Sequence, residues 1–552
     1  MAERYALGID FGTESGRALL VNVETGEEVA TYVHPYPHGV LDTALPDGTP
    51  LEHDWALQDP NDWIEILTVT VPQVMRAAGA APEQVIGIGV DFTSCTVLPV
   101  KQDGTPLCNL PQFKSRPHAW PKLWKHHAAQ PEADRITQAI RQRGETILER
   151  YGGKMSSEWI FPKIWQVLDE DEEIYDAADR FIEGGDWIVE QLCGQEARSS
   201  CMAGYKGMWD KEEGFPSPEL LKSLHPKLEN IVGTKLSKTI LPLGSKAGEL
   251  TAKMAELMGL KAGTAVAVAI IDAHSAVPGS GVTEPGKMLM VMGTSTCHML
   301  LSEKKMKVDG MCGCVRDGIL PGFYGYEAGQ PATGDIFAWF VENCVPYPVY
   351  EEANNRGVSV HYVLEERAAR LAPGQSGLIA LDWWNGNRSV LVDAELSGLM
   401  LGMTLTTRPE EMYLALIEAT AFGTRKIIEA FAGSGIPITE LFACGGLAER
   451  NKLLLRVYAN VTGLPIRIAQ SPQTCALGAA ILGTVAAGKA AGGYDTPQEA
   501  AARMARLKDE AYAPDATAHQ AYTDLYQEYT QLHDYFGRGA NDVMKRLRKM
   551  RG

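Results

Sequence analysis

An aspartate, two glycines, a threonine and a serine lie together near the start of the chain, in the run Asp10-Phe-Gly-Thr-Glu-Ser-Gly-Arg17. Apolar runs on both sides predict two strands joined by a polar turn. Glycine lets such a turn approach a ligand closely, and its N–H groups and hydroxyls form a concave site for phosphate oxygens. A hydrated Mg²⁺ beside the phosphates needs a carboxylate, which Asp10 supplies. The candidate phosphate contacts are Gly12, Thr13, Ser15 and Arg17.

A second segment repeats this plan in the middle of the chain. Residues 286–301 contain an apolar run, the turn Gly293-Thr294-Ser295 and another apolar run, as residues 4–21 do. Neither turn is a P-loop, because no Gly-Lys-Ser/Thr follows and a strand comes next. An ordinary glycine hairpin is the alternative for either segment alone. The structural pseudo-repeat predicts two similar lobes with a nucleotide between them, and adds Gly293 and Thr294 as phosphate contacts.

Another aspartate ends a strongly apolar run. The run Ala265-Val-Ala-Val-Ala-Ile-Ile-Asp272 is typical of a buried strand. Ligands of parallel α/β sheets bind outside the carboxyl ends of the strands. Asp272 is therefore predicted to be the catalytic residue, a base that accepts the proton of a hydroxyl attacking phosphorus, with Mg²⁺ within its reach. The alternative is that Asp272 only caps the helix that follows.

A glycine pair separates a strand from a helix in the run Cys444-Gly445-Gly446-Leu-Ala-Glu-Arg450-Asn451. Gly445 and Gly446 allow a flat aromatic base to approach the backbone, and Arg450 and Asn451 are expected one turn into the helix. A simple helix entry is the alternative. A third run of small residues, 475–480, predicts close packing of a helix.

Three side chains lie in settings that favour a sugar ligand. Glu327 follows the aromatic run Phe323-Tyr-Gly-Tyr326, Lys206 lies among apolar and aromatic residues, and the Trp124 ring can stack on a sugar face. The alternatives are an acid favoured at a helix start, a surface lysine and a core tryptophan. His126 and His127 are not expected to bind one metal ion, because adjacent side chains on a helix point apart.

The segments that position these residues alternate between strands and helices. We expect a strand over 84–91 and helices over 131–151, 161–174 and 186–192 in the first half. The second half predicts helices over 335–343 and 409–432, a strand over 440–444, and a polar helix in the last forty residues. No linker or low-complexity segment separates the halves, so domains 1–282 and 283–552 with a short hinge near residue 280 are expected.

Bulk properties restrict the class of protein. A chain of 552 residues with 45% hydrophobic and 22% charged residues can form two large domains, each with its own core. The net charge of −18 argues against nucleic-acid and acidic-membrane partners. The first residues predict no signal peptide, and no apolar run predicts a membrane span. The ten cysteines lack the spacing of a disulfide framework or a zinc site, which favours a cytoplasmic location.

These residues resemble the FGGY carbohydrate kinases over nearly the whole chain, from Tyr5 to about Gly488. The most specific parts are Asp10–Arg17, the Asp272 strand, Gly293-Thr294, and Cys444–Asn451 with the following residues 458–466. The segments Asp91-Phe-Thr93, Leu123-Trp124-Lys-x-His127 and Gly204-Tyr205-Lys206 are most similar to members that act on L-ribulose. The resemblance implies an α/β, two-lobed actin-like ATPase fold, with a ribonuclease-H-like core in each lobe and the active site in the interlobe cleft. It also implies ATP-dependent phosphorylation of the 5-hydroxyl of L-ribulose.

The same resemblance implies a role for each candidate residue. Asp272 is the base, and Asp10 and Asp272 contact Mg²⁺. The implied ATP contacts are Gly12, Thr13, Ser15, Arg17, Gly293 and Thr294 for the phosphates, and Gly334, Gly445, Gly446, Arg450 and Asn451 around the adenosine. The implied sugar contacts are Thr93, Ser94, Trp124, Lys206, Asp272 and Glu327. Relatives often have Asp where this chain has His126, which leaves the role of His126 open, and the Trp-x-Asp-x-Arg pattern of other members is absent.

Other functions stay open at this point. The nearest is a kinase of the same family acting on D-ribulose, xylulose or a polyol. A nucleotide-switched protein of the actin or Hsp70 kind, without sugar kinase activity, and a silent sugar sensor are more distant. The candidate sugar contacts argue against the switch, and the presence of both Asp10 and Asp272 argues against the sensor. A homodimer is expected only from the prevalence of two-fold assemblies.

Overall fold

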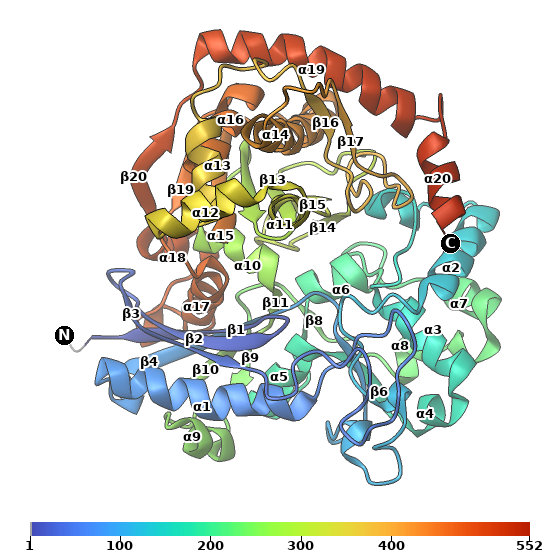
Figure 1. Cartoon of the computed structure of the whole chain (residues 1–552). Coiled ribbons are helices and arrows are strands. Elements are labelled where there is room, and N and C mark those ends of the chain that lie inside the picture. The colour runs from blue at the N-terminus through green and yellow to red at the C-terminus, as the bar shows by residue number, and fades with distance from the viewer. Residues whose placement is uncertain (1–2, 552) are drawn as a thin grey trace. The chain divides into compact units, whose positions relative to one another are not determined.

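The computed structural model describes residues 3–551, which divide into two compact units (Figure 1). The first unit comprises the chain up to Thr283 together with Gly313–Gly325 and Gln473–Arg506. The second comprises Glu284–Cys312, Tyr326–Pro472 and the chain from Leu507 onward. Each unit therefore combines segments that are far apart in sequence. The functional domains expected over 1–282 and 283–552 stay a prediction.

The first unit is built on a mixed sheet with the strand order β3-β2-β1-β4-β10-β9. Strands β1 to β3 form consecutive antiparallel hairpins, whereas β4 is parallel to β1, and both β10 and β11 are parallel to β4. Every residue of β1 is buried, as the near-continuous apolar runs of central parallel strands require. The strands are β1 (Tyr5–Phe11), β2 (Ser15–Asn22), β3 (Glu28–Pro35), β4 (Val85–Phe92), β9 (Lys246–Glu249), β10 (Ala265–Ala267) and β11 (Ile270–Ile271).

The sheet of the second unit contains the order β15-β13-β12-β18-β19-β20. An antiparallel hairpin (β12, β13) is followed by two parallel strands (β18, β19) and an antiparallel edge strand (β20). This order repeats the first sheet strand by strand, which confirms the pseudo-repeat at the level of topology. The strands are β12 (Lys287–Met292), β13 (Thr296–Ser302), β15 (Tyr324–Gln330), β18 (Glu440–Cys444), β19 (Ile466–Ala469) and β20 (Leu507–Tyr512).

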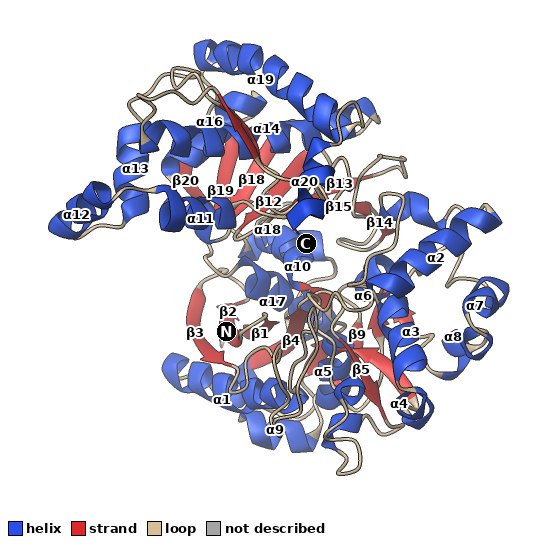
Figure 2. Cartoon of the chain, turned by 45° about the vertical axis from the view of Figure 1, so that its right-hand side comes forward, coloured by secondary structure: helices blue, strands red, loops and turns tan. Residues whose placement is uncertain are grey.

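Helices cover both faces of the sheet in the first unit, where α1 and α17 lie on opposite sides (Figure 2). Its helices are α1 (Pro60–Ala78), α2 (Gln130–Arg143), α3 (Ile160–Glu170), α4 (Glu172–Ala177), α5 (Gly184–Cys193), α6 (Ser200–Lys206), α7 (Pro218–Leu224), α8 (Ile231–Thr234), α9 (Ala252–Met258), α10 (Asp272–Gly279), α17 (Thr474–Ala487) and α18 (Pro497–Met504). Short strand pairs are β5 (Val97–Val100) with β6 (Arg180–Glu183) and β7 (Arg198–Ser199) with β8 (Ile240–Leu241), and β14 (Gly313–Arg316) also belongs to this unit.

The second unit contains α11 (Gly334–Cys344), α12 (Tyr347–Arg356), α13 (Val360–Ala368), α14 (Pro409–Gly433), α15 (Gly446–Arg450), α16 (Lys452–Thr462), α19 (Ala516–Gly537) and α20 (Val543–Arg551), with the strand pair β16 (Ile379–Leu381) and β17 (Leu399–Leu401). The expected helices over 335–343 and 409–432 are confirmed as α11 and α14.

Helix α17 lies directly on β1 and β4, although about four hundred residues separate them (Figure 1). A Cβ atom added to Gly8 or Gly89 would lie 1.8 Å from the carbonyl oxygen of Ala476 or Ala479, respectively. A Cβ added to Gly478, within the helix, would lie 1.8 Å from another backbone carbonyl, that of Ser275. Glycine is therefore required for this close backbone approach. The prediction that the small residues at 475–480 serve helix packing is confirmed.

Two expected helices in the first unit are interrupted. The helix expected over 131–151 ends at Arg143, because Gly144 adopts a left-handed φ of 68°, and a separate 3₁₀ segment spans residues 147–151. The helix expected over 161–174 is two helices, α3 and α4. Asp171 ends the first and caps the second, since its side chain accepts a hydrogen bond from the Ile174 N–H.

Two other expectations are also corrected. The apolar strand before Asp272 is split into β10 and β11, with residues 268 and 269 outside regular pairing. The single polar helix expected at the C-terminus is two helices, α19 and α20, separated at residues 538–542. Neither break changes which residues reach the ends of the central strands.

No helix within residues 3–551 is long and apolar enough to cross a bilayer. All ten cysteines are free thiols, as their scattered spacing predicts. Six of them are buried and the other four are half-buried, so they contribute to packing rather than to covalent cross-links.

Candidate functional site

The first glycine turn connects β1 to β2 in the first unit. Strand pairing continues to Phe11 opposite Gly16, and the Gly12 N–H donates to the Ser15 carbonyl at 3.0 Å. The corresponding turn of the second unit joins Met292 to Thr296, and there the Gly293 N–H donates to the Ser295 carbonyl at 2.9 Å. The two turns therefore share a closing hydrogen bond, but the second is one residue shorter.

Side chains from three other segments hold the first turn in place. The Trp124 indole N–H donates to the Thr13 hydroxyl at 3.1 Å, and the Gln58 amide donates to the Thr13 carbonyl at 2.8 Å. The Tyr36 hydroxyl donates to the Gly12 carbonyl at 3.0 Å. The structure thus brings Trp124 to the predicted phosphate hairpin. Sequence reasoning missed Gln58 and Tyr36, because no local pattern distinguishes them.

Two carboxyl groups lie side by side at the carboxyl ends of β1 and β4. Asp10 is the register partner of Asp91 on the parallel side and of Arg17 on the antiparallel side. The Arg17 Nε lies 3.4 Å from an Asp10 oxygen. Asp91 is fully buried beside Asp10, and the two carboxyl groups lie within hydrogen-bonding reach of each other. Paired carboxyl groups at the end of the strands fit a cation or its water shell.

The surroundings of these carboxyl groups shift their protonation. Burial raises the pKa of Asp10, and the Arg17 guanidinium opposes this shift. Burial raises the pKa of Asp91 well above its usual range, and the charges of Asp10 and Asp272 raise it further. The sequence pattern assigns no role to Asp91. An apolar run precedes Asp91, as it does Asp10 and Asp272, and this shared pattern could have identified it as a third carboxyl group at a strand end.

Asp272 follows β11 immediately and begins α10. Because Ile271 pairs with Phe92, the Asp272 carboxylate emerges at the same edge of the sheet as Asp91 and Asp10. It accepts a hydrogen bond from the Ala273 N–H at 2.7 Å and is only half-buried. The cap alternative is not met, because Ile271 is the N-cap residue of α10 and no side chain caps this helix. The position of Asp272 at the sheet edge is the one that predicts catalysis.

The loop after β4 carries Thr93 and Ser94. The Thr93 N–H donates to the Phe11 carbonyl at 3.1 Å, which joins this loop to the end of β1. The Thr93 and Thr96 hydroxyls form a hydrogen bond of 3.1 Å, while Cys95 between them adopts a left-handed φ of 52°. For a residue with a side chain this conformation is costly, so the loop is constrained by its neighbours.

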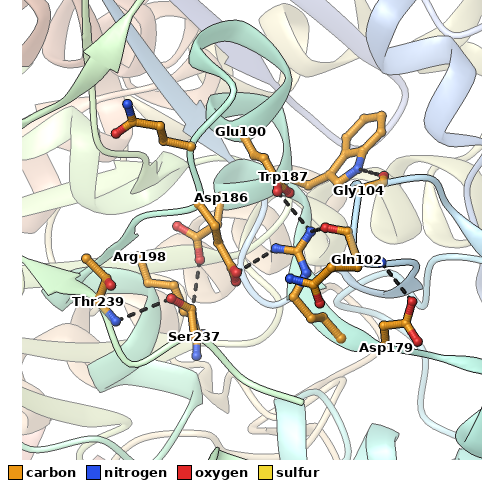
Figure 3. A network of polar contacts seen from close by, with 12 residues as sticks. Gln102, Gly104, Asp179, Asp186, Trp187, Glu190, Arg198, Ser237 and Thr239 are labelled. Atoms are coloured by element: carbon orange, nitrogen blue, oxygen red, sulfur yellow. Dashed lines mark hydrogen bonds and ion pairs between the residues drawn. The ribbon is translucent and has the colours of Figure 1, made fainter. Parts of the chain in front are cut away.

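Lys206 is the last residue of α6 and is 6% exposed, so it is not a surface lysine. Its Nζ lies 6.0 Å from the Trp159 ring centroid. Helix α6 starts two residues after Arg198, whose guanidinium contacts the buried carboxyl group of Glu183. It also lies 3.2 Å from a carboxyl oxygen of Asp186, which Figure 3 shows beside it. This fully buried network fixes the segment from which α6 extends.

The second turn is bonded to the start of α11 in the second unit. The carbonyl of Gly293 accepts from the Gly334 N–H at 3.1 Å, and that of Thr294 accepts from the Thr333 N–H at 2.7 Å. A Cβ at Gly334 would lie 2.5 Å from the Gly293 oxygen. The structure therefore brings Gly293, Thr294 and Gly334 together, and their contact requires glycine.

The glycine pair lies at the end of β18, beside the same turn. Gly445 adopts a φ of 93°, and its added Cβ would lie 2.6 Å from the Met292 carbonyl oxygen. The single helix expected after Gly446 is corrected to two: Arg450 ends α15, and Asn451 caps α16 by accepting from the Leu454 N–H at 2.8 Å. Gly446 and Arg450 are exposed, whereas Asn451 is buried.

Glu327 lies in β15, on the second unit, and its side chain is 9% exposed. Its carbonyl accepts from the Cys312 N–H at 2.8 Å. Glu327 lies within a strand, which excludes the alternative of an acid at a helix start.

The adjacent histidines are in a turn rather than in a helix, and each has its own partner. His126 is fully buried, accepts from the Ala56 N–H at 3.3 Å and contacts the Gln166 amide oxygen at 2.8 Å. Burial lowers its pKa well below the usual range, so the ring is neutral. His127 contacts the Ser157 hydroxyl. Neither is placed to share a metal ion with the other, and the hydrogen bonds of His126 connect this turn to Ala56 and Gln166.

Within residues 3–551, one group of three side chains has the geometry for a metal ion: His38, Asp59 and Asp62. These groups already have partners. The His38 Nδ1 lies 2.8 Å from an Asp62 oxygen, and Asp59 caps α1 by accepting from the Asn61 N–H. The group is explained by local structure.

Two parts of the sequence match the two domains of one protein family. Residues 5–279 match the N-terminal domain, and residues 288–487 the C-terminal domain, of the FGGY family of carbohydrate kinases. The chain is 57% identical over 552 residues to a ribulokinase of Halalkalibacterium halodurans, with 100% of this chain and 98% of that protein covered. It is 58% identical over 549 residues to a ribulokinase of Geobacillus thermodenitrificans, with 99% and 97% covered.

Solved structures with low sequence identity share the fold. A xylulose kinase from Rhodospirillum rubrum matches with a TM-score of 0.80 at 21% identity, covering 96% of this chain and 98% of that one. A Plasmodium falciparum glycerol kinase with ADP matches with a TM-score of 0.77 at 16% identity, with the same coverage. The predicted α/β, actin-like fold is confirmed by these matches and by the repeated sheet order.

Proposed function

The chain belongs to the FGGY family of carbohydrate kinases, and we propose that it is a ribulokinase, which transfers the γ-phosphate of ATP to the 5-hydroxyl of L-ribulose in L-arabinose catabolism. The observation that supports this most strongly is the full-length identity of 57% to a ribulokinase. The first unit agrees with it, because carboxylates lie at neighbouring strand ends beside a glycine turn. A kinase for D-ribulose, xylulose or a polyol would use the same geometry.

Asp272 acts as the general base in this proposal. Its carboxylate accepts the proton of the sugar hydroxyl as the oxygen attacks phosphorus, and such positioning typically contributes about 10²–10⁴ in rate. The Ala273 N–H at 2.7 Å occupies one carboxyl oxygen, so it orients the group. Phosphoryl transfer otherwise needs in-line alignment and charge stabilisation rather than covalent help.

Asp10 and Asp272 would hold the hydrated Mg²⁺ in this proposal, with the buried Asp91 beside Asp10. Magnesium, when bound, neutralises phosphate charge and aligns the γ-phosphate. Without a cation, burial and the mutual repulsion of the carboxylates favour a proton on Asp91, as its raised pKa indicates.

The remaining candidate residues bind and orient the two substrates. The turn residues Gly12, Thr13, Ser15 and Arg17 of the first unit and Gly293 and Thr294 of the second contact the phosphates. The adenosine lies against Gly334, Gly445, Gly446, Arg450 and Asn451. The sugar is held by Thr93, Ser94, Trp124, Lys206, Asp272 and Glu327. Ordered contacts to the sugar exclude water, which is a competing nucleophile, so little ATPase activity is expected without sugar.

The free cysteines support a reducing compartment, so the proposed location is the cytoplasm. The homodimer expected from general prevalence stays a prediction.

The first experiment measures ADP release from MgATP with L-ribulose, D-ribulose, D- and L-xylulose, ribitol, glycerol and no sugar. L-Ribulose should give the highest kcat/KM, and Asp272→Asn should lower its kcat by about 10³-fold. Asp103→Asn is the matched control, because this exposed carboxylate accepts from the Thr105 N–H in a distant turn. Preference for another sugar would refute L-ribulose as substrate, and equal ADP release with and without every sugar would refute the kinase.

A further inference from the structure

A fully buried lysine of the first unit is bonded entirely to backbone carbonyls. The Lys163 Nζ donates to the Cys95 carbonyl at 2.7 Å, to the Leu123 carbonyl at 2.8 Å and, more weakly, to the Lys122 carbonyl at 3.4 Å. An ammonium group has three protons, and these three acceptors use all of them. Burying a charge costs several kcal/mol unless the group is fully hydrogen-bonded. The burial of this lysine therefore indicates that its three hydrogen bonds have a structural role.

The acceptors belong to the two loops that carry proposed sugar contacts. Cys95 follows Thr93 and Ser94, and Leu123 precedes Trp124. The loops also pair directly, since the Lys122 N–H donates to the Val97 carbonyl at 2.8 Å. Lys163 therefore connects both loops at one point.

The lysine is presented by a rigidly packed helix. Lys163 lies in α3, whose apolar residues belong to a large core cluster that includes Ile160, Ile164 and Trp165. Helix α3 makes a second bond to the same turn, because Gln166 contacts His126 at 2.8 Å. A core-anchored helix can thus fix the position of two otherwise irregular loops.

The connection extends to the phosphate hairpin. Trp124, next to the Leu123 carbonyl, donates to the Thr13 hydroxyl at 3.1 Å. A shift of the 122–126 turn would therefore be passed to the hairpin as well as to the sugar loop. Small misplacements of this kind are costly in catalysis, since about 1 Å can lower the rate by 10²-fold.

We propose that Lys163 is a positioning residue for sugar binding: it clamps the 93–96 loop to the 122–126 turn and so sets the placement of Ser94 and Trp124. This inference rests on the proposed function. Lys163 touches no substrate, and its effect is carried by the three carbonyl groups that it orders. The hydrogen bond that His126 donates to the Gln166 amide oxygen holds the same turn from the next turn of α3.

The test compares Lys163→Met with a matched control, Lys235→Met. Lys235 is half-buried in the same unit and also donates to two backbone carbonyls, those of Tyr175 and Ala178, at a site without proposed sugar contacts. K163M should lower kcat/KM for L-ribulose by about 30- to 100-fold, mainly through KM, and leave the KM for ATP within about twofold. K235M should change neither KM by more than about twofold.

Hydrogen exchange gives a readout that does not depend on activity. Amides of residues 93–98 and 122–127 should exchange at least about tenfold faster in K163M than in the wild type, and K235M should not affect them. If K163M does not fold, Gln166→Met replaces it, with an expected rise of about 3- to 10-fold in the KM for L-ribulose.

Unchanged sugar KM in folded K163M, an equal rise in the KM for ATP, or unchanged exchange in both loops would overturn the clamp. Failure of the proposed function is distinguishable, because the wild type would then show no L-ribulose-dependent ADP release. The exchange comparison alone would in that case decide whether Lys163 orders the loops.

Discussion

The close contact between β4 and α17 allows a quantitative prediction for Gly89→Ala. The new Cβ would lie 1.8 Å from the Ala479 carbonyl oxygen and 2.5 Å from its carbon. Ordinary contacts of this kind begin near 3.4 Å, so the helix backbone must move away by about 1.5 Å. A flexible side-chain end can rotate out of such a clash, but a helix backbone cannot.

Two opposing effects determine the magnitude. Replacing a strand glycine by alanine contributes about 0.5–1 kcal/mol of stability through the unfolded chain. Overpacking costs about 1–3 kcal/mol, and a gap of 0.5–1 Å already removes a quarter to a half of the dispersion attraction. The clash is with the backbone of α17, which packs on both β1 and β4 and cannot move away from one strand alone. The destabilisation is therefore at the upper end of the overpacking range. A net loss of about 2 kcal/mol is expected.

The assay is urea unfolding followed by tryptophan fluorescence, with thermal melting as a second measurement. Gly433→Ala is the control, because no atom lies within 4 Å of its added Cβ and its φ is ordinary. It should be neutral or slightly stabilising. Since Asp91 lies two residues further along β4, G89A should also lower kcat/KM. A loss below about 0.5 kcal/mol, or an equal loss in G433A, would refute the steric argument.

Three further predictions concern polar contacts. Trp124→Phe removes the donor to Thr13, so kcat/KM should fall about fivefold in steady-state kinetics, the equivalent of about 1 kcal/mol; an unchanged value would contradict this. Burial raises the pKa of Asp186 to about 8, so the folded state retains a proton that the unfolded state loses near pH 4, and stability falls as pH rises through that window. Asp186→Asn should flatten this slope in urea unfolding at pH 6 and 9, and an unaltered slope would exclude the group. Tyr529→Phe removes the hydroxyl donor to Asp382 at 3.1 Å and should cost about 1–2 kcal/mol in thermal unfolding, with no effect on sugar KM.

Local pattern was sufficient to predict the parts of the site that lie within one short segment. The hairpin around Gly12, the second hairpin around Gly293 and the strand before Asp272 depend on alternating burial, glycine turns and strand ends, which are local properties. Their repetition predicted two similar lobes, and the resemblance to the FGGY carbohydrate kinases implied the actin-like fold class. Boundaries were less accurate, since the break at Asp171 depends on a side chain that caps the next helix.

Residues whose role depends on distant partners could not be predicted in this way. Asp91 becomes part of the site through the parallel register that places it opposite Asp10. Trp124 was expected at the sugar, but its bond to Thr13 joins positions more than a hundred residues apart. Local sequence patterns do not show which distant residues pair, because tertiary packing selects the strand register and the side-chain partners.

The sequence by itself therefore determined the chemistry that is available: carboxylates at strand ends, glycine turns and aromatic neighbours. The tertiary structure decided which groups meet and how rigidly they are held. Helix α17 packs on the first sheet from the far end of the chain, and Lys163 joins two loops that come from separate parts of the sequence. The physical reason is that side-chain type and local periodicity are properties of the chain, whereas register, burial and the satisfaction of buried polar groups arise only when distant segments share one core.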